Sequence, residues 1–106
     1  MTLAQRFLRW WRRHRGRLEV ARVPEVPAEL RRGVLALVGE DAEPWAAVLI
    51  CPCGCDARTE LLLAPGPETF WRVTHGPAGT TLSPSVWRTS GCRSHYFVRE
   101  SAILWC

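Results

Sequence analysis

The stretch Trp45-Ala-Ala-Val-Leu-Ile-Cys-Pro-Cys-Gly-Cys-Asp56 joins an apolar run to a compact group of cysteines. The run has the length of a buried strand and is far shorter than the ~20 residues of a membrane-spanning helix. Three cysteines then occupy every second position, separated by a proline and a glycine: Cys51, Cys53 and Cys55. Close-set cysteines seldom have the separation and side-chain directions that a disulfide needs. We therefore expect free thiols that present sulfur ligands to a zinc ion.

A structural zinc site takes four ligands, so the three cysteines need a fourth partner. Cys92 is the best candidate, because it lies in a similar loop, Ser90-Gly-Cys-Arg-Ser-His95. The predicted ligands are Cys51, Cys53, Cys55 and Cys92, and the terminal Cys106 is left out. An alternative combines two or three of the early cysteines with Cys92 and His95, whose Cys-x-x-His spacing also suits a metal. The first site supports folding, whereas an open site completed by water makes zinc hydrolytic.

Hydroxyl groups and a histidine converge on the same region. The segment Thr81-Leu-Ser-Pro-Ser-Val-Trp-Arg88 leads directly to Gly91-Cys-Arg-Ser-His95. A serine becomes a nucleophile when a nearby base takes its proton. Neighbours on an extended chain point to opposite faces, so Ser85 or Ser83 is a better partner for His95 than Ser94. The structural alternative is that Ser-Pro-Ser forms an ordinary loop and the histidine bonds a backbone carbonyl.

Other titratable and aromatic residues carry weaker signals. The carboxylates that can orient a catalytic histidine are not ranked by the pattern: Asp56, Glu60, Glu68 and Glu100. His14 and His75 are weaker candidates for chemistry than His95. Four tryptophans are spaced one per strand or loop, which favours a role in the core: Trp45, Trp71, Trp87 and Trp105. Their faint interleaving with arginine does not predict a nucleic-acid partner.

Short alternating or apolar segments recur along the chain without a long helix between them. They are Leu18–Val23, Gly33–Val38, Trp45–Ile50, Arg58–Ala64, Phe70–His75, Tyr96–Arg99 and Ala102–Trp105. Glu100 and Ser101 would form a tight hairpin, although this pair is not preferred in such a turn. We expect a mainly β, small zinc-stabilised domain over residues 18–106.

Residues 1–17 differ in composition from the rest of the chain. They hold six arginines and no acid, whereas the remainder has eight arginines against ten carboxylates. Aromatic and aliphatic side chains at helical intervals predict a short basic amphipathic helix. Docking on the body or partial disorder is favoured over membrane contact by residues 2–15. Because the N-terminus lacks the features of a secretory signal, we expect a cytoplasmic protein.

Several motifs occur in an order that resembles a known bacterial family, the one catalogued as domain of unknown function 6527. The two most specific are Cys51-Pro-Cys-Gly-Cys55 and Cys92-Arg-Ser-His-Tyr-Phe97. They are accompanied by Val23-Pro-Glu-Val-Pro27, Leu82-Ser-Pro-Ser-Val86 and a closing Ile103-Leu-Trp105. The resemblance runs from about residue 20 to the end. One departure is Arg99-Glu-Ser-Ala102, where the family's last hairpin turn is expected to contain glycine.

The resemblance implies a small Zn²⁺-binding peptidase in an operon with a ubiquitin-like protein and its activating-like or conjugating-like enzymes. It implies a serine-type, deubiquitinase-like activity that processes or removes the modifier, within antiviral defence. The corresponding metal positions are Cys51, Cys53, Cys55 and Cys92. The corresponding catalytic positions are Ser85 and His95, with Ser94 in reserve. The alternative function is a non-catalytic zinc-binding module that docks a component of the same system.

Overall fold

The computed structural model describes residues 2–3, 17–40, 42–63 and 71–106. The mainly β class is confirmed, because the elements found in these residues are strands. They are β1 (Glu19–Val23), β2 (Val34–Gly39), β3 (Pro44–Ile50), β4 (Arg58–Leu62), β5 (Arg72–Gly76), β6 (Gly79–Trp87), β7 (His95–Arg99) and β8 (Ala102–Trp105). The expected basic helix falls mostly on residues 4–16, outside the described residues, and the division at residue 17 stays a prediction.

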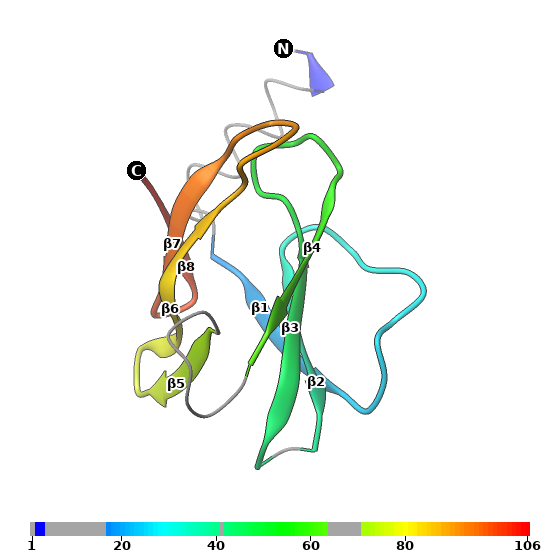
Figure 1. Cartoon of the computed structure of the whole chain (residues 1–106), viewed down its shortest axis with the longest axis vertical. Helices are drawn as coiled ribbons and strands as arrows, with labels where there is room; N and C mark the ends of the chain where they lie inside the picture. The colour runs from blue at the N-terminus through cyan, green and yellow to red at the C-terminus, as the bar shows by residue number, and fades with distance from the viewer. Residues whose placement is uncertain (1, 4–16, 41, 64–70) are drawn as a thin grey trace.

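The strands form two four-stranded sheets, shown in Figure 1. The first has the order β1-β2-β3-β4, with β1 parallel to β2 and the other pairs antiparallel. The second has the order β5-β6-β7-β8 and is antiparallel throughout. Single bridges join the sheets at their edges, from Leu63 to Trp71 and from Arg17 to Ala102. These bridges hold the two layers around one core.

Side chains that point between the sheets form the main core. Strand alternation puts every second residue on this side, as in β6 and β7, where buried and exposed positions alternate. Tyr96 is the largest fully buried side chain and lies between the layers. The core members are Leu18, Leu35, Leu37, Ala47, Leu49, Leu61, Leu63, Leu82, Val86, Tyr96, Val98 and Ile103.

Strand β2 is buried on both faces, which explains its unbroken apolar sequence. A second cluster forms on its outer side from Ala36 and Val38 of β2 and two residues of β3. Leu30, in the connection between β1 and β2, packs against this cluster. The guanidinium of Arg58 fixes the connection by donating hydrogen bonds to the carbonyls of Pro27 and Ala28.

Ser-Pro-Ser lies within strand β6, so it is not the ordinary loop of the structural alternative, and this strand was not among the predicted segments. Leu82 pairs with Val98, and Val86 pairs with Tyr96. Residues 83–85 therefore lie opposite Phe97 alone, which makes a β-bulge with two additional residues. Proline inside a run argues against a strand because it cannot donate to the ladder, and the bulge removes that requirement. The bond between Ser83 and Pro84 is cis.

The hairpin at Glu100 and Ser101 is confirmed, and both residues have positive φ, 52° and 63°. Glycine adopts positive φ more easily than these residues do, and hydrogen bonds stabilise the turn in its absence. The Glu100 N–H donates to Thr81 Oγ1 at 2.9 Å, and the Thr80 N–H donates to Ser101 Oγ at 2.9 Å. Strand β6 thus supports a turn that its own residues disfavour. Gly79 passes so close that a Cβ there would lie 2.6 Å from the Glu100 carbonyl carbon.

Candidate active site and metal centre

Two loops at the same end of the molecule bring four cysteines together. Cys51 follows β3, and a tight turn over residues 52–55 carries Cys53 and Cys55. Cys92 comes from the connection between β6 and β7, which Figure 1 shows at the end where β3 connects to β4. The four Sγ atoms lie within 4.8 Å of one another, and Cys51 Sγ is 3.6 Å from Cys92 Sγ. The structure therefore gathers the four predicted ligands at one point.

The sulfur arrangement fits a tetrahedral metal centre. Zn–S bonds of ~2.3 Å place tetrahedral sulfurs about 3.8 Å apart. The distance from Cys51 Sγ to Cys53 Sγ is 3.4 Å, and all five cysteines of the chain are free thiols. Four soft ligands complete a closed shell, so the cysteine cluster, defined as Cys51, Cys53, Cys55 and Cys92, can hold a metal ion such as zinc. His95 is not part of this group, so the arrangement does not favour the open-site alternative.

Backbone and side-chain contacts fix the loop that carries three of these cysteines. The Cys51 N–H donates to the Ala57 carbonyl at 2.7 Å. The Arg32 guanidinium donates to the Gly54 carbonyl at 3.3 Å and forms an ion pair with the Asp56 carboxylate. Gly54 has φ 99°, a conformation that side chains rarely adopt. The connection between β1 and β2 thus supports, from outside, the loop that carries Cys53 and Cys55.

The side chain of Ser94 contacts the cysteine cluster. Its Oγ lies 3.1 Å from Cys92 Sγ and 3.6 Å from Cys51 Sγ, and its side chain is buried. This hydroxyl lowers the pKa of Cys92 to about 6, because a hydrogen bond to sulfur stabilises the thiolate. Burial raises the pKa of Cys51 to about 12, since desolvation disfavours its charged form. A bound cation would offset that cost.

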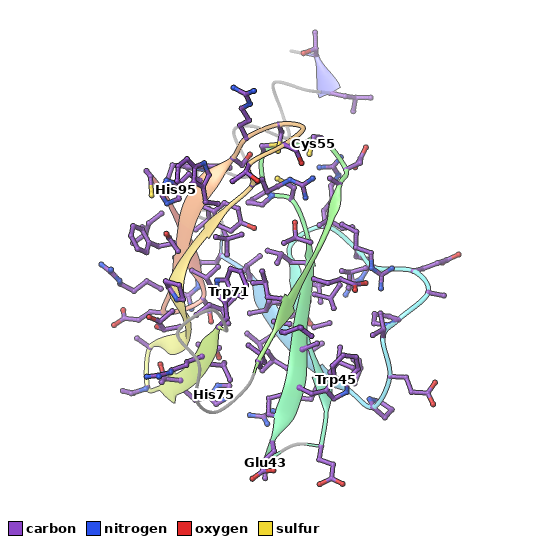
Figure 2. All side chains as sticks on the ribbon, viewed as in Figure 1. Glu43, Trp45, Cys55, Trp71, His75 and His95 are labelled. Atoms are coloured by element: carbon purple, nitrogen blue, oxygen red, sulfur yellow. The ribbon has the colours of Figure 1, made fainter. Side chains whose placement is uncertain are left out.

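Ser85 and His95 meet on the outer face of the second sheet, the face that points away from the first sheet (Figure 2). Ser85 Oγ lies 2.9 Å from His95 Nε2, within hydrogen-bond distance. The bulge in β6 supplies this geometry, because two additional residues turn Ser85 toward the first residue of β7. Ser94, next along the chain from His95, points to the cysteines instead. In Figure 2, His95 lies on the face of the second sheet that points away from the first sheet.

Aromatic side chains surround the His95 ring. Trp87 stacks on it with ring centroids 5.2 Å apart and an angle of 17° between the planes. Phe97 lies on the same face of β7, with its centroid 6.4 Å from that of His95. Trp87 is 64% exposed, so the expectation that it belongs to the core is wrong. Trp45 and Trp105 are also about half exposed, whereas Trp71 packs against the core.

The carboxylates considered from sequence lie elsewhere. Among the described residues, no carboxylate forms an ion pair with His95. Asp56 pairs with Arg32, Glu60 pairs with Arg58, and Glu100 is in the hairpin at the far end of β7. Glu68 lies outside the described residues.

The remaining histidines do not enlarge the site. His75 Nδ1 lies 2.9 Å from Thr80 Oγ1, and Figure 2 shows His75 at the other end of the second sheet from His95. His14 lies outside the described residues. The features that sequence reasoning missed are the bulge and the Trp87 stack. The two-residue spacing of Ser85 and Trp87 was the available signal for the stack, because it puts both on one face of a strand.

In the part of the chain that is described, no helix has the length and apolar character needed to cross a membrane. Comparison with curated proteins and with solved structures yields no match. Comparison with family models yields BubE, described as the bacterial ubiquitination-like system serine protease, over residues 22–106. That range includes the cysteine cluster, Ser85 and His95. The chain therefore belongs to the family of serine proteases of bacterial ubiquitination-like systems.

Proposed function

We propose that the protein is a peptidase in which Ser85 is the nucleophile and His95 is the general base. The observation that carries the proposal is the 2.9 Å distance between Ser85 Oγ and His95 Nε2. A serine and a base within hydrogen-bond reach are the minimum arrangement for nucleophilic catalysis. Family membership supports the serine class, and the bulge explains why this serine, rather than Ser83, reaches the histidine.

The reaction follows from this contact. His95 in its Nδ1–H tautomer has an unprotonated Nε2, which takes the proton as Ser85 Oγ attacks the substrate carbonyl carbon. The resulting tetrahedral intermediate collapses when the imidazolium gives that proton to the leaving amine, which leaves an acyl ester on Ser85. Water, deprotonated by His95, then attacks the ester. The imidazolium returns that proton to Ser85 Oγ as the ester C–O bond breaks, which releases the carboxylic acid product and free Ser85. Arg93 and the backbone N–H groups of residues 90–93 are candidates to stabilise the oxyanion.

The cysteine cluster has a separate, structural role in the proposal. Cys51, Cys53, Cys55 and Cys92 would hold zinc in a closed shell, and the metal would cross-link the loops that follow β3 and β6. No ligand position remains for a water molecule, so the proposed chemistry rests on the serine and the histidine. The zinc-linked loop leads directly into His95, which couples metal binding to the position of the base.

The proposed substrate is the ubiquitin-like protein of the same system, cut after its C-terminal residue or released from a conjugate. Family membership supports this choice because the family acts in a bacterial ubiquitination-like system. Activating-like or conjugating-like enzymes are the other proposed partners, with a cytoplasmic location and a part in antiviral defence. Ser85 and His95 are half-buried on the outer face of the second sheet, a position that a protein substrate can approach.

The test is cleavage of a C-terminally extended ubiquitin-like protein, followed by mass spectrometry. We expect the zinc-loaded wild type to cut it, and Ser85→Ala and His95→Ala to lose at least about 10³-fold in kcat. Ser83→Ala is the matched control, because it alters an exposed serine in the same bulge. Stable binding by the wild type without cleavage would contradict the proposal and would favour a non-catalytic zinc module.

A further inference from the structure

The His95 ring is held by stacking where a serine protease triad uses an acid. In a triad, the acid orients the histidine and stabilises the imidazolium that forms when the histidine takes the serine proton. Among the described residues, His95 has no carboxylate partner, while Ser85 and the Trp87 indole both contact its ring. Within the described residues, a group other than a carboxylate must therefore orient His95 and stabilise its imidazolium.

The position of Trp87 meets the orienting requirement. Trp87 and His95 are directly opposite each other in the register of β6 and β7, and their rings are within 17° of parallel. Ser85 lies two residues before Trp87, on the same face of the same strand. The indole therefore limits rotation of the imidazole while Nε2 stays 2.9 Å from Ser85 Oγ.

The indole face also meets the electrostatic requirement. Aromatic faces carry negative potential, and indole attracts a cation more strongly than phenyl does. The 5.2 Å distance between centroids is within the range of a cation–π contact. We propose that Trp87 is a positioning residue that orients His95 and stabilises its imidazolium form, in place of the acid of a triad. This inference rests on the proposed function of Ser85 and His95.

Phe97 does not meet these requirements equally well. Its ring is 6.4 Å from that of His95 and is tilted by 32°. Its π system already interacts with a cation, because the Arg99 guanidinium lies 5.4 Å from the ring centroid. A second cation gains less from a ring that is already polarised by the first. Trp87 is thus the favoured partner of the imidazolium.

The first test separates kcat from KM in three variants. Trp87→Leu should lower kcat about 2- to 30-fold with little change in KM, and Trp87→Phe should retain a larger share of the activity. The matched control is Trp45→Leu, because Trp45 is 50% exposed and lies on the first sheet, far from His95 in Figure 2. This control should keep wild-type kcat. Thermal unfolding should show that Trp87→Leu stays folded, since the indole is mostly exposed.

The second test changes the electronic character of the ring without changing its shape. Wild-type protein is produced with tryptophan analogues that carry increasing numbers of fluorine atoms. Its kcat should fall with each added fluorine, because fluorine withdraws electron density from the indole face. In Trp87→Phe produced with the same analogues, kcat should not depend on the number of fluorine atoms. A merely structural role for Trp87 would not produce this difference between the two proteins.

Each contrary result has a distinct meaning. If the wild type is active and Trp87→Leu has an unchanged kcat, or differs from the wild type only by a raised KM, the role of Trp87 is overturned. The serine mechanism would then stay in place. Equal sensitivity of wild type and Trp87→Phe to fluorination would overturn the cation–π argument. A wild type without turnover would refute the proposed function, and the inference would fall with it.

Discussion

Replacing Cys92 with serine removes the one sulfur that the loop after β6 contributes to the cysteine cluster. Cys92 Sγ lies 3.6 Å from Cys51 Sγ, and the Sγ atoms of the whole cluster are within 4.8 Å of one another. Because Cys92 is exposed, the substitution leaves no cavity in the core. Its effect therefore reports on metal binding and on the link between the two loops.

The magnitude follows from the number of ligands. Structural zinc binds with an apparent free energy of about 10 to 16 kcal/mol, so one of four equal sulfur ligands represents about 2.5 to 4 kcal/mol. That corresponds to an affinity about 10² to 10³ times lower. At a fixed free zinc concentration that saturates both proteins, a hundredfold loss lowers the free energy of unfolding by about 2.7 kcal/mol. For a domain of this size, Tm should fall by about 10 to 20 °C.

The assay is competition for zinc with a chromophoric chelator, combined with thermal unfolding of the zinc-loaded protein. Cys106→Ser is the matched control, because Cys106 is also an exposed free thiol but lies outside the cysteine cluster. The control should keep wild-type affinity and Tm. Wild-type zinc affinity in Cys92→Ser, or an equal loss in Cys106→Ser, would refute the four-cysteine site.

One further substitution tests the surroundings of the cysteine cluster, and two test the hairpin at Glu100 and Ser101. Ser94→Ala should weaken zinc binding about 10- to 100-fold in the same competition assay, because the Ser94 hydroxyl supports Cys92; unchanged affinity would rule out that support. Gly79→Ala should lower the free energy of unfolding in urea by about 2 kcal/mol or more, because its Cβ would lie 2.6 Å from the Glu100 carbonyl carbon and its φ is +142°. Glu100→Asn should raise the same free energy by about 0.5 to 1 kcal/mol, since asparagine tolerates the observed φ of 52°, and a decrease would contradict the turn geometry.

Much of the fold could be predicted from the alternation and length of apolar segments. The continuous run Val34–Gly39 is buried on both faces, and the predicted hairpin at Glu100 and Ser101 is present. Strand β6 was not predictable in the same way, because Pro84 breaks the pattern and only pairing with β7 shows that the ladder resumes after the bulge. Long-range hydrogen bonds, rather than local preference, decide that segment.

The candidate site could also be predicted only in part. The spacing of the early cysteines indicated metal ligands, and strand alternation favoured Ser85 or Ser83 over Ser94 as the partner of His95. The stacking of Trp87 on His95 was not predicted, because large aromatic residues are usually assigned to the core, and the spacing that puts Ser85 and Trp87 on one face does not say which face points outward. That contact depends on the register between two strands.

The most direct measurement is to locate the nucleophile by peptide mapping after reaction with a fluorophosphonate probe, which forms a covalent adduct with an activated serine. We expect an adduct on Ser85 in the wild type and almost no adduct in His95→Ala, because Ser85 Oγ would then lose its base at 2.9 Å. In Cys92→Ser, assayed with excess zinc, any adduct that forms should still be on Ser85. An adduct on Ser83 or Ser94, or equal labelling of Ser85 without His95, would contradict the proposed dyad.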